Sequence, residues 1–230
     1  MTTTGTRARG DQVASTRAAI LSTAERLFAE HGVAAVSARQ ISEAAGQGNN
    51  AAVGYHFGTK LDVVRAILAG HNEAIEARRA RRVAEVSGST ELRDWVTCLV
   101  LPSAEYFASL GTPTWYARFS TQIMTDPVLR PVMQEDSLGA PSLRQVLHGI
   151  HLCEADLPTA VRHDRGDMAM YLLLHTFADL ERAQADGDAT GPASWARAAS
   201  GLVDAMVGLF QAPATLAITD TNSSSKEGTS

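Results

Sequence analysis

The sequence predicts an all-α protein, and three observations support this fold class. Alanine is abundant and aromatic residues make up only 6% of the chain, a composition that favours helices over sheets. Apolar residues recur with the spacing of one helical face. The sequence has no run of alternating apolar and polar residues bounded by turns, the pattern that would predict a β-strand. The clearest helical set is Ile20, Leu21, Ala24, Leu27 and Phe28.

The chain divides into four segments. Residues 1–11 are rich in Thr, Gly and Arg and are interpreted as a disordered arm. Residues 12–58 predict three short helices, and residues 59–211 predict a longer helical body that can bury a substantial core. Residues 212–230 are polar and aperiodic, which predicts a disordered tail.

The first helix is expected over residues 12–31, with Gly32 to end it. Ser37 and Gln40 then have the spacing of a capping box, in which each side chain satisfies a backbone N–H at the helix start. A short second helix is therefore expected from Ser37. Gly46 ends it, because glycine adopts the left-handed conformation without steric cost.

A turn and another short helix follow. Residues 47–50 favour a turn and offer an asparagine as N-cap, and residues 51–56 form the helix, with Val53 and Phe57 facing inward. Helices this short are marginal in isolation, so they must pack against the first helix. Two short helices joined by a tight turn, the second poor in bulky side chains, predict a helix-turn-helix whose second helix enters a DNA major groove.

The residues from Thr16 to Leu61 resemble the DNA-binding head of the TetR family of one-component transcriptional regulators. Gly54 stands where that family usually has a tyrosine. The Asn49-Asn50 pair resembles a subset of the family with a longer turn. The matching residues are Arg17, Ile20, Ala24, Leu27, Phe28, Ala29, Glu30, Gly32, Ile41, Ala45, Gly46, Tyr55, His56, Phe57 and Lys60.

The expected DNA contacts lie in and around the two short helices. Tyr55, His56 and Lys60 resemble the family residues that bind phosphate. Asn49 and Asn50 can bind an adenine edge or phosphate, and the alternative for this pair is an N-cap and a turn residue. Phosphate contacts set the register, whereas base contacts select the sequence. The full set is Arg17, Arg39, Gln47, Asn49, Asn50, Gly54, Tyr55, His56 and Lys60.

The charge distribution agrees with this interpretation. Residues 1–60 carry six Arg or Lys side chains and four Asp or Glu side chains, a net charge of +2, within a chain of net charge −5. The remaining residues therefore carry −7. A basic head on an acidic body is the distribution that confines phosphate attraction to one end of the molecule.

The body begins with a helix that Thr59 caps, with Asp62 at the third helical position, and this helix is expected to run past residue 80. Pro102 lies inside an otherwise helical pattern, which predicts a kink or a break. The other helical segments are expected at residues 90–109, 114–124, 127–150, 158–186 and 192–211.

Four arginines near the end of the first body helix have two interpretations. Ion pairs with neighbouring glutamates on a solvated face are the expected state, and a second DNA-binding patch is the alternative. These arginines are Arg78, Arg79, Arg81 and Arg82.

The family resemblance implies a small-molecule pocket within the body. Aromatic and methionine side chains in its helices are the candidates to line the pocket, although such residues are more often ordinary core. The candidates are Trp95, Leu99, Tyr106, Trp115, Phe119, Met124 and Met133.

The resemblance also implies an Ω-shaped homodimer, with the last two helices forming a four-helix interface. Two recognition helices held about 34–36 Å apart would reach successive major grooves of a palindrome. The expected interface residues are Tyr171, Leu172, His175, Leu202, Met206, Leu209 and Phe210.

Other classes of protein lack support in the sequence. Cys98 and Cys153 lack metal-ligand spacing, as do the histidines of the body, so neither a metal site nor a cofactor is expected. No signal region and no apolar run of about 20 residues occurs, so a cytoplasmic protein without a membrane partner is expected. No catalytic motif is present, so an enzyme is not expected.

These features predict a sequence-specific DNA-binding repressor that a small-molecule effector releases from a palindromic double-stranded operator. One alternative is a DNA-binding organiser or activator that has no effector. The other is a helical enzyme that has acquired a DNA-binding head.

Overall fold

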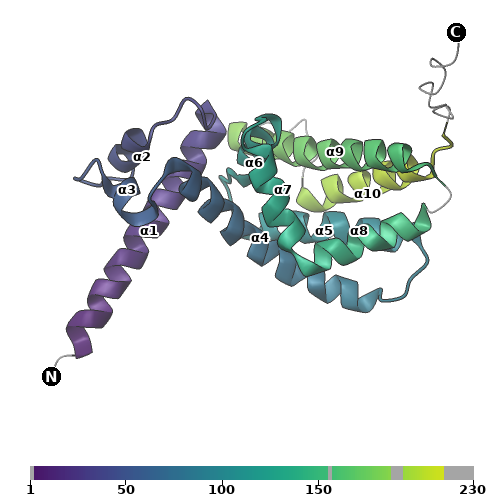
Figure 1. The fold of residues 1–230 in the computed structure, drawn as a ribbon, viewed down its shortest axis with the longest axis horizontal. Helices are drawn as coiled ribbons and strands as arrows, with labels where there is room; N and C mark the ends of the chain where they lie inside the picture. The colour runs from purple at the N-terminus through teal and green to yellow at the C-terminus, as the bar shows by residue number, and fades with distance from the viewer. Residues whose placement is uncertain (1–2, 155–156, 188–193, 215–230) are drawn as a thin grey trace, which may run out of the picture.

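Ten α-helices form the regular structure of residues 3–154, 157–187 and 194–214, the part of the chain that the computed structural model describes (Figure 1). No β-strand occurs in those ranges, which confirms the predicted all-α fold class. The helices form a small N-terminal head and a larger helical body, and one long helix runs from the head into the body (Figure 1).

Three helices and the start of a fourth build the head. They are α1 (Thr3–His31), α2 (Ala38–Ala44), α3 (Ala52–Phe57) and α4 (Lys60–Glu85). The predicted stops and caps of α1 and α2 are confirmed. Gly32 follows α1 with φ of 83°, and Gly46 follows α2 with φ of 69°. Ser37 and Gln40 form the predicted capping box at the start of α2.

Helix α1 begins earlier than its sequence predicts. It starts at Thr3, whereas a disordered arm was expected up to residue 11, so that expectation is wrong from Thr3 onward. The physical reason is that a helix already nucleated over residues 12–31 extends at little cost, since each added residue forms one more backbone hydrogen bond. Residues 1–2 lie outside the described part of the chain.

Six helices and the remainder of α4 form the body. Their order follows the predicted segments closely, with one exception described below. The six are α5 (Leu92–Leu110), α6 (Tyr116–Thr125), α7 (Arg130–Gly139), α8 (Pro141–Cys153), α9 (Thr159–Asp186) and α10 (Trp195–Gln211). The expected start of α4 is confirmed by a second capping box, formed by Thr59 and Asp62.

Two prolines act differently from each other. The single helix expected over residues 127–150 is divided into α7 and α8 at Ala140, whose extended ψ of 114° is typical of the residue before a proline. Pro102, in contrast, lies inside α5, which continues through it, so a break there is excluded. Pro102 is buried, and its packing offsets the loss of the backbone hydrogen bond that proline cannot donate.

The expected disordered tail lies mostly outside the described residues, and Ala212 to Ala214 are not helical.

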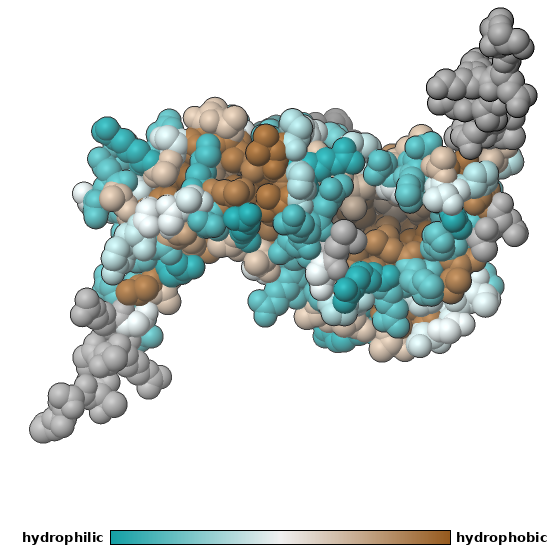
Figure 2. Space-filling view, viewed as in Figure 1, coloured by the Kyte–Doolittle hydropathy of each residue, from teal (hydrophilic) through white to brown (hydrophobic). Residues whose placement is uncertain are grey.

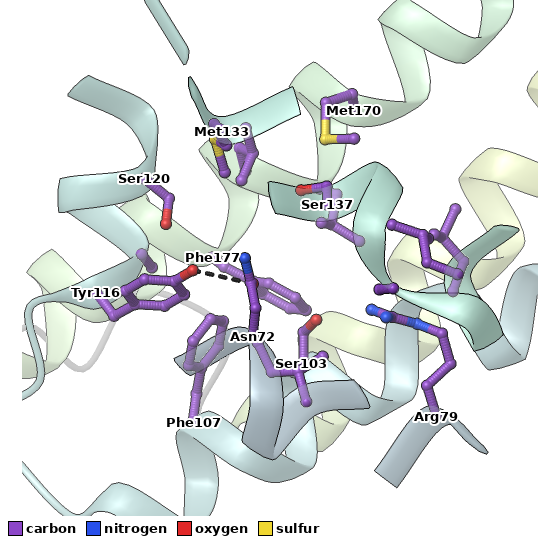
Figure 3. Close-up of a pocket in the computed structure, with 17 residues that line it drawn as sticks. Asn72, Arg79, Ser103, Phe107, Tyr116, Ser120, Met133, Ser137, Met170 and Phe177 are labelled. Atoms are coloured by element: carbon purple, nitrogen blue, oxygen red, sulfur yellow. Dashed lines mark hydrogen bonds between the residues drawn. The ribbon is translucent and has the colours of Figure 1, made fainter. Parts of the chain in front are cut away.

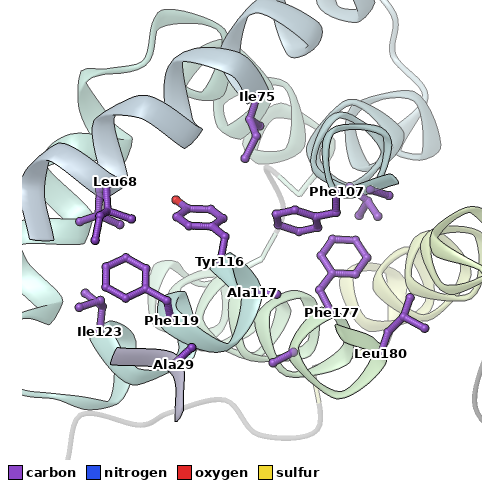
Figure 4. Packing of buried hydrophobic residues seen from close by; sticks show 14 of the residues in the cluster. Ala29, Leu68, Ile75, Phe107, Tyr116, Ala117, Phe119, Ile123, Phe177 and Leu180 are labelled. Carbon is purple, nitrogen blue, oxygen red and sulfur yellow. The ribbon is translucent and has the colours of Figure 1, made fainter. Parts of the chain in front are cut away.

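Aromatic side chains connect the helices at the centre of the body (Figure 4). The Phe107 ring lies 5.5 Å from that of Phe177, 5.1 Å from that of Trp195 and 6.0 Å from that of Tyr116, measured between ring centroids. Each such pair contributes about 0.5–1.5 kcal/mol beyond the area it buries. On the other side, Phe119 stacks on Phe28 of α1, so the core continues from the body into the head.

Candidate nucleic-acid interface and ligand cavity

Helix α3 is held against α2 by one buried hydroxyl. The Ser42 side chain on α2 accepts a hydrogen bond of 3.3 Å from the backbone N–H of Val53, and donates one of 3.1 Å to the carbonyl of Ala38. Val53 itself is buried, as predicted. This contact fixes the crossing of the two short helices. The outer face of α3 is left to solvent, with Gly54 exposed and Tyr55 79% exposed.

The turn before α3 uses its polar side chains locally. Asn49 does not act as N-cap. Its side-chain oxygen instead accepts from the backbone N–H of Ala51 at 2.9 Å, and Ala51 occupies the N-cap position without a side-chain bond. Gln47 donates its amide to the carbonyl of Ala45 at 3.1 Å. Asn50 is exposed. The local alternative for Asn49, a turn residue, therefore agrees with the structure.

Arg17 does not face solvent as an expected phosphate contact would. Its guanidinium donates to the backbone carbonyl of His56 and lies 4.1 Å above the ring of Phe57. Because a cation over an aromatic face and a charge-assisted hydrogen bond both hold it in place, Arg17 fastens the end of α3 to α1. Phe57 is half-buried beneath it.

Lys60 also has an internal role that the sequence did not indicate. Its ammonium donates to the carbonyls of Val33 at 2.7 Å and Val36 at 3.0 Å, in the loop between α1 and α2. The side chain is half-buried. It therefore satisfies backbone acceptors of the loop, and the expected phosphate contact of Lys60 stays a prediction.

Replacing Lys60 by Met is expected to lower the free energy of unfolding by about 1–2 kcal/mol, because two carbonyls lose their donor. Urea denaturation of the full-length protein measures this change. Arg39→Met is the control, since the Arg39 side chain is 72% exposed and pairs only across one helical turn with Glu43. A Lys60→Met variant that is as stable as wild type but binds DNA with a weaker salt dependence would support the phosphate role instead.

The solvent-facing polar residues of the head form one candidate interface. Tyr55 and the half-buried His56 lie side by side, with ring centroids 4.9 Å apart in a T-shaped arrangement. Gly54 leaves open space around it, since a Cβ added there would meet no atom within 4 Å. The interface comprises Arg39, Asn49, Asn50, Gly54, Tyr55 and His56.

A cavity of about 90 Å³ lies inside the body, enclosed by helices α4 to α9 (Figure 3). Of the predicted ligand contacts, Leu99 and Met133 line it. Most of the wall is apolar, including Phe107 and Phe177. The lining residues with polar groups are Asn72, Arg79, Ser103, Tyr116, Ser120 and Ser137.

Five predicted ligand contacts lie elsewhere. Trp95 is buried and donates its indole N–H to the carbonyl of Ser89 at 3.0 Å, while Phe119 and Met124 belong to the core. Apolar periodicity marks buried positions without distinguishing filled from empty space, which is why these three residues are packed in the core and do not line the 90 Å³ cavity.

The other two, Tyr106 and Trp115, contact polar side chains of neighbouring residues. The Tyr106 hydroxyl lies 2.8 Å from His71 Nδ1, and the guanidinium of Arg118 lies 4.5 Å above the ring of Trp115. Neither residue lines the 90 Å³ cavity.

The sequence contains an indication, which the sequence analysis did not use, that two polar residues belong to the cavity wall. Asn72 and Arg79 continue the apolar stripe of α4 through Leu68 and Ile75, at helical spacings of four, three and four residues. A polar residue on an apolar stripe either has a buried partner or faces a cavity. Arg79 is buried, so the expected solvated position is wrong for it.

A chain of polar contacts connects the cavity wall to the head. Tyr116 lines the cavity and donates to the Asn72 side chain at 3.2 Å (Figure 3), and its ring stacks on His71 at 3.8 Å between centroids. His71 Nε2 lies 2.8 Å from Glu25 Oε2 on α1. Burial raises the pKa of Tyr116, which keeps its hydroxyl protonated as a donor. A change at the cavity wall therefore has a short contact route to α1.

A second cavity of about 160 Å³ adjoins the first. Helices α8 and α9 supply most of its wall, and four residues line both cavities: Leu99, Leu143, Met170 and Leu173. Figure 2 shows hydrophobic residues in a recess of the surface between the ridges of α8 and of α9 with α10. The two cavities are thus neighbours in the body, separated and lined by the same four mainly apolar side chains.

The predicted interface residues of the last two helices fall into two groups. Tyr171, Leu172 and His175 are exposed on α9. Leu202, Met206 and Phe210 are buried within their own subunit and belong to its core, whereas Leu209 is half-buried and its interface role stays a prediction. The reason is that the apolar stripe of α10 faces α5 and α9. Its outer face instead carries mostly small residues, including Ala196, Ser200, Gly201, Ala205 and Gly208.

Two further features concern metals and membranes. In residues 3–154, 157–187 and 194–214, no group of three or more His, Cys, Asp or Glu side chains is placed to hold a metal ion. No helix in the described part of the chain combines the length and the apolar character needed to cross a membrane.

The fold and the exposed α3 define the chain as a helix-turn-helix protein with a helical body. The family model for bacterial regulatory proteins of the tetR family matches residues 20–67. The HTH-type transcriptional repressor AcnR of Corynebacterium glutamicum is 32% identical over 126 residues, which cover 54% of this chain and 58% of AcnR. The matched region thus spans less than two thirds of that relative.

A crystal structure described as a tetR family transcription regulator from Shewanella sp. PV-4 shares the fold. Its TM-score is 0.58 at 19% sequence identity, and the superposition covers 85% of this chain and 95% of that one. Residues 20–67 therefore match the tetR family, which confirms the resemblance seen in the sequence of the head.

Proposed function

We propose that the protein is a homodimeric repressor that binds a palindromic DNA operator and is released by a small-molecule effector. The observation that carries the proposal is the exposed outer face of α3, with Gly54 open and Tyr55 largely in solvent. A slim helix of this kind fits a major groove. As a DNA-binding regulator it would act in the cytoplasm. The relative AcnR is named a transcriptional repressor.

Dimerisation is supported by the outer face of α9 and α10. Leu172 is 39% exposed, and Met168 and Tyr171 accompany it on α9. The small residues on the outer face of α10 would let a second copy of the helix approach closely. An apolar patch beside a smooth helix face is well suited to a two-fold contact between identical subunits.

Replacing Leu172 by Asp is expected to raise the dissociation constant of the dimer at least about tenfold, because two carboxylates would be buried across the two-fold axis. Sedimentation equilibrium measures the change. Leu152→Asp is the matched control, since Leu152 is an exposed leucine on α8, outside the proposed interface. An unchanged dimer in the Leu172→Asp variant would place the interface on another face.

Effector release is supported by the cavity and by the contacts that lead from it. A ligand in the cavity would touch Tyr116 and Asn72, and Tyr116 stacks on His71, which binds Glu25 of α1. A ligand shifts the DNA-bound population only if it prefers one arrangement of the subunits. Displacement of Tyr116 would move His71 and α1, and hence change the separation of the two α3 helices.

The test is selection of bound duplexes from random DNA by the full-length protein, repeated with a panel of small molecules. We expect a palindrome with half-sites about one helical turn apart, and at least one compound that weakens binding. Enrichment of no sequence at low ionic strength would contradict the DNA-binding role. An operator that no compound affects would favour the organiser or activator without an effector, which the internal cavities make the weaker candidate.

A further inference from the structure

Arg79 is the one arginine or lysine in the wall of the 90 Å³ cavity, within the described part of the chain. It is 7% exposed. Figure 3 shows its guanidinium directed from α4 toward the interior of the cavity, in the direction of Ser103. A buried cation is expensive unless anions and hydrogen-bond acceptors surround it, so the partners of each nitrogen decide what it can bind.

The hydrogen-bond partners of Arg79 do not satisfy all the N–H groups of its guanidinium. Nη1 donates to Glu76 Oε2 at 3.2 Å, whereas Nε is buried and has no hydrogen-bond partner among the described residues. Glu76 is itself shared, since its other oxygen accepts from the backbone N–H of Ser142 at 2.6 Å. Burial lowers the pKa of Arg79 although Glu76 opposes this effect. The charge of the guanidinium is therefore only partly compensated.

The rest of the lining has a different character. Phe107, Phe177, Met133 and Met170 supply an apolar wall, and the second cavity prolongs it past Leu173. The hydroxyl of Ser120 is buried in the same wall and also lacks a partner among the described residues. The 90 Å³ cavity thus offers one guanidinium, that of Arg79, beside a mainly apolar wall, whereas the second cavity also has Arg162, Glu154, His151 and His163 in its lining.

We infer that the cavity binds a small carboxylic acid with an apolar body, whose carboxylate takes the free side of the Arg79 guanidinium. A carboxylate matches the planar fork of arginine through two parallel N–H···O bonds, which a neutral hydroxyl cannot do. The apolar body lies along Phe107, Phe177 and Met170 toward the second cavity. This inference names the chemical class of the proposed effector and therefore rests on the proposed effector role of the cavity.

The test compares octanoate with 1-octanol, two probes of equal chain length that differ in the anionic group. Isothermal titration calorimetry on the full-length protein without DNA measures both affinities. We expect octanoate to bind at least about tenfold more tightly than 1-octanol, because a hydrogen-bonded ion pair is lost in the alcohol. Arg79→Gln should weaken octanoate at least about tenfold and leave 1-octanol unchanged. Arg81→Gln, on the exposed side of the same helix, should change neither affinity.

Three results would overturn the inference: no octanoate binding at millimolar concentration, equal affinity for the two probes, or full octanoate affinity in folded Arg79→Gln. If the Arg79→Gln variant does not fold, the comparison of octanoate with 1-octanol on the wild-type protein still tests whether the cavity prefers a carboxylate. Since no DNA is present, the outcome is independent of the operator selection. Octanoate binding through Arg79 without any selected operator would refute the repressor role alone, whereas a selected operator without octanoate binding would refute the carboxylate class alone.

Discussion

Replacing Gly54 by Glu is expected to lower operator affinity at least about a hundredfold while leaving the fold intact. Gly54 lies on the exposed face of α3, where an added Cβ would meet no atom within 4 Å. Glutamate is a better helix former than glycine, so α3 itself would not be weakened. In the proposed complex, however, the new carboxylate would stand between two rows of phosphates, and the dimer would carry it twice.

Fluorescence anisotropy with the selected operator at fixed salt measures this loss, and urea denaturation checks that the variant is folded. Gly70→Glu is the matched control. Gly70 is also an exposed helical glycine with open space around it, but it lies on α4, away from α3. Equal effects of the two substitutions would show that added charge, rather than the position on α3, governs binding. No effect of Gly54→Glu would remove α3 from the interface.

Replacing Glu181 by Ala is expected to destabilise the protein by about 3–5 kcal/mol, the usual cost of removing one partner from a buried ion pair. Glu181 on α9 is 1% exposed. Its carboxylate accepts from the backbone N–H groups of Ala117 at 3.2 Å and Arg118 at 2.9 Å, and from Arg118 Nε at 3.3 Å. These N–H groups belong to the first turn of α6 and have no partner within that helix.

Urea denaturation of the full-length protein measures the loss. Glu105→Ala is the control, because Glu105 also pairs with an arginine of another helix, Arg82, but its side chain is 45% exposed. An exposed pair of this kind contributes about 0–1 kcal/mol. Similar losses in the two variants would mean that Glu181 does not cap α6. Since α6 carries Tyr116, the Glu181→Ala variant should also lose the contact between cavity and head.

The capping boxes and glycines in the sequence of the head correctly predicted where its helices begin and end. The capping boxes at Ser37 and Thr59 and the glycines at positions 32 and 46 are satisfied within a few residues of chain, so the sequence contains both partners of each contact. The division of residues 127–150 at Pro141 was missed, although proline restricts the residue before it.

The roles of long side chains were less predictable. Arg17 and Lys60 were expected to contact DNA, but their partners are His56 and the loop carbonyls of Val33 and Val36, which lie 24 to 39 positions away in the chain. The same applies to the cavity, since a periodic apolar stripe is common to core and cavity wall. Among the expected ligand contacts only Leu99 and Met133 line the 90 Å³ cavity.

The sequence by itself determined the helical class, the helix-turn-helix and the family resemblance of the head, because these depend on periodicity, caps and turns between residues close in the chain. The tertiary structure alone decided which side chains are free to act. Arg79 is held in a cavity wall, Met206 faces its own core and Leu172 remains outside. The physical reason is that burial and hydrogen-bond partners arise from packing between distant helices, and the charge or polarity of a residue does not specify them.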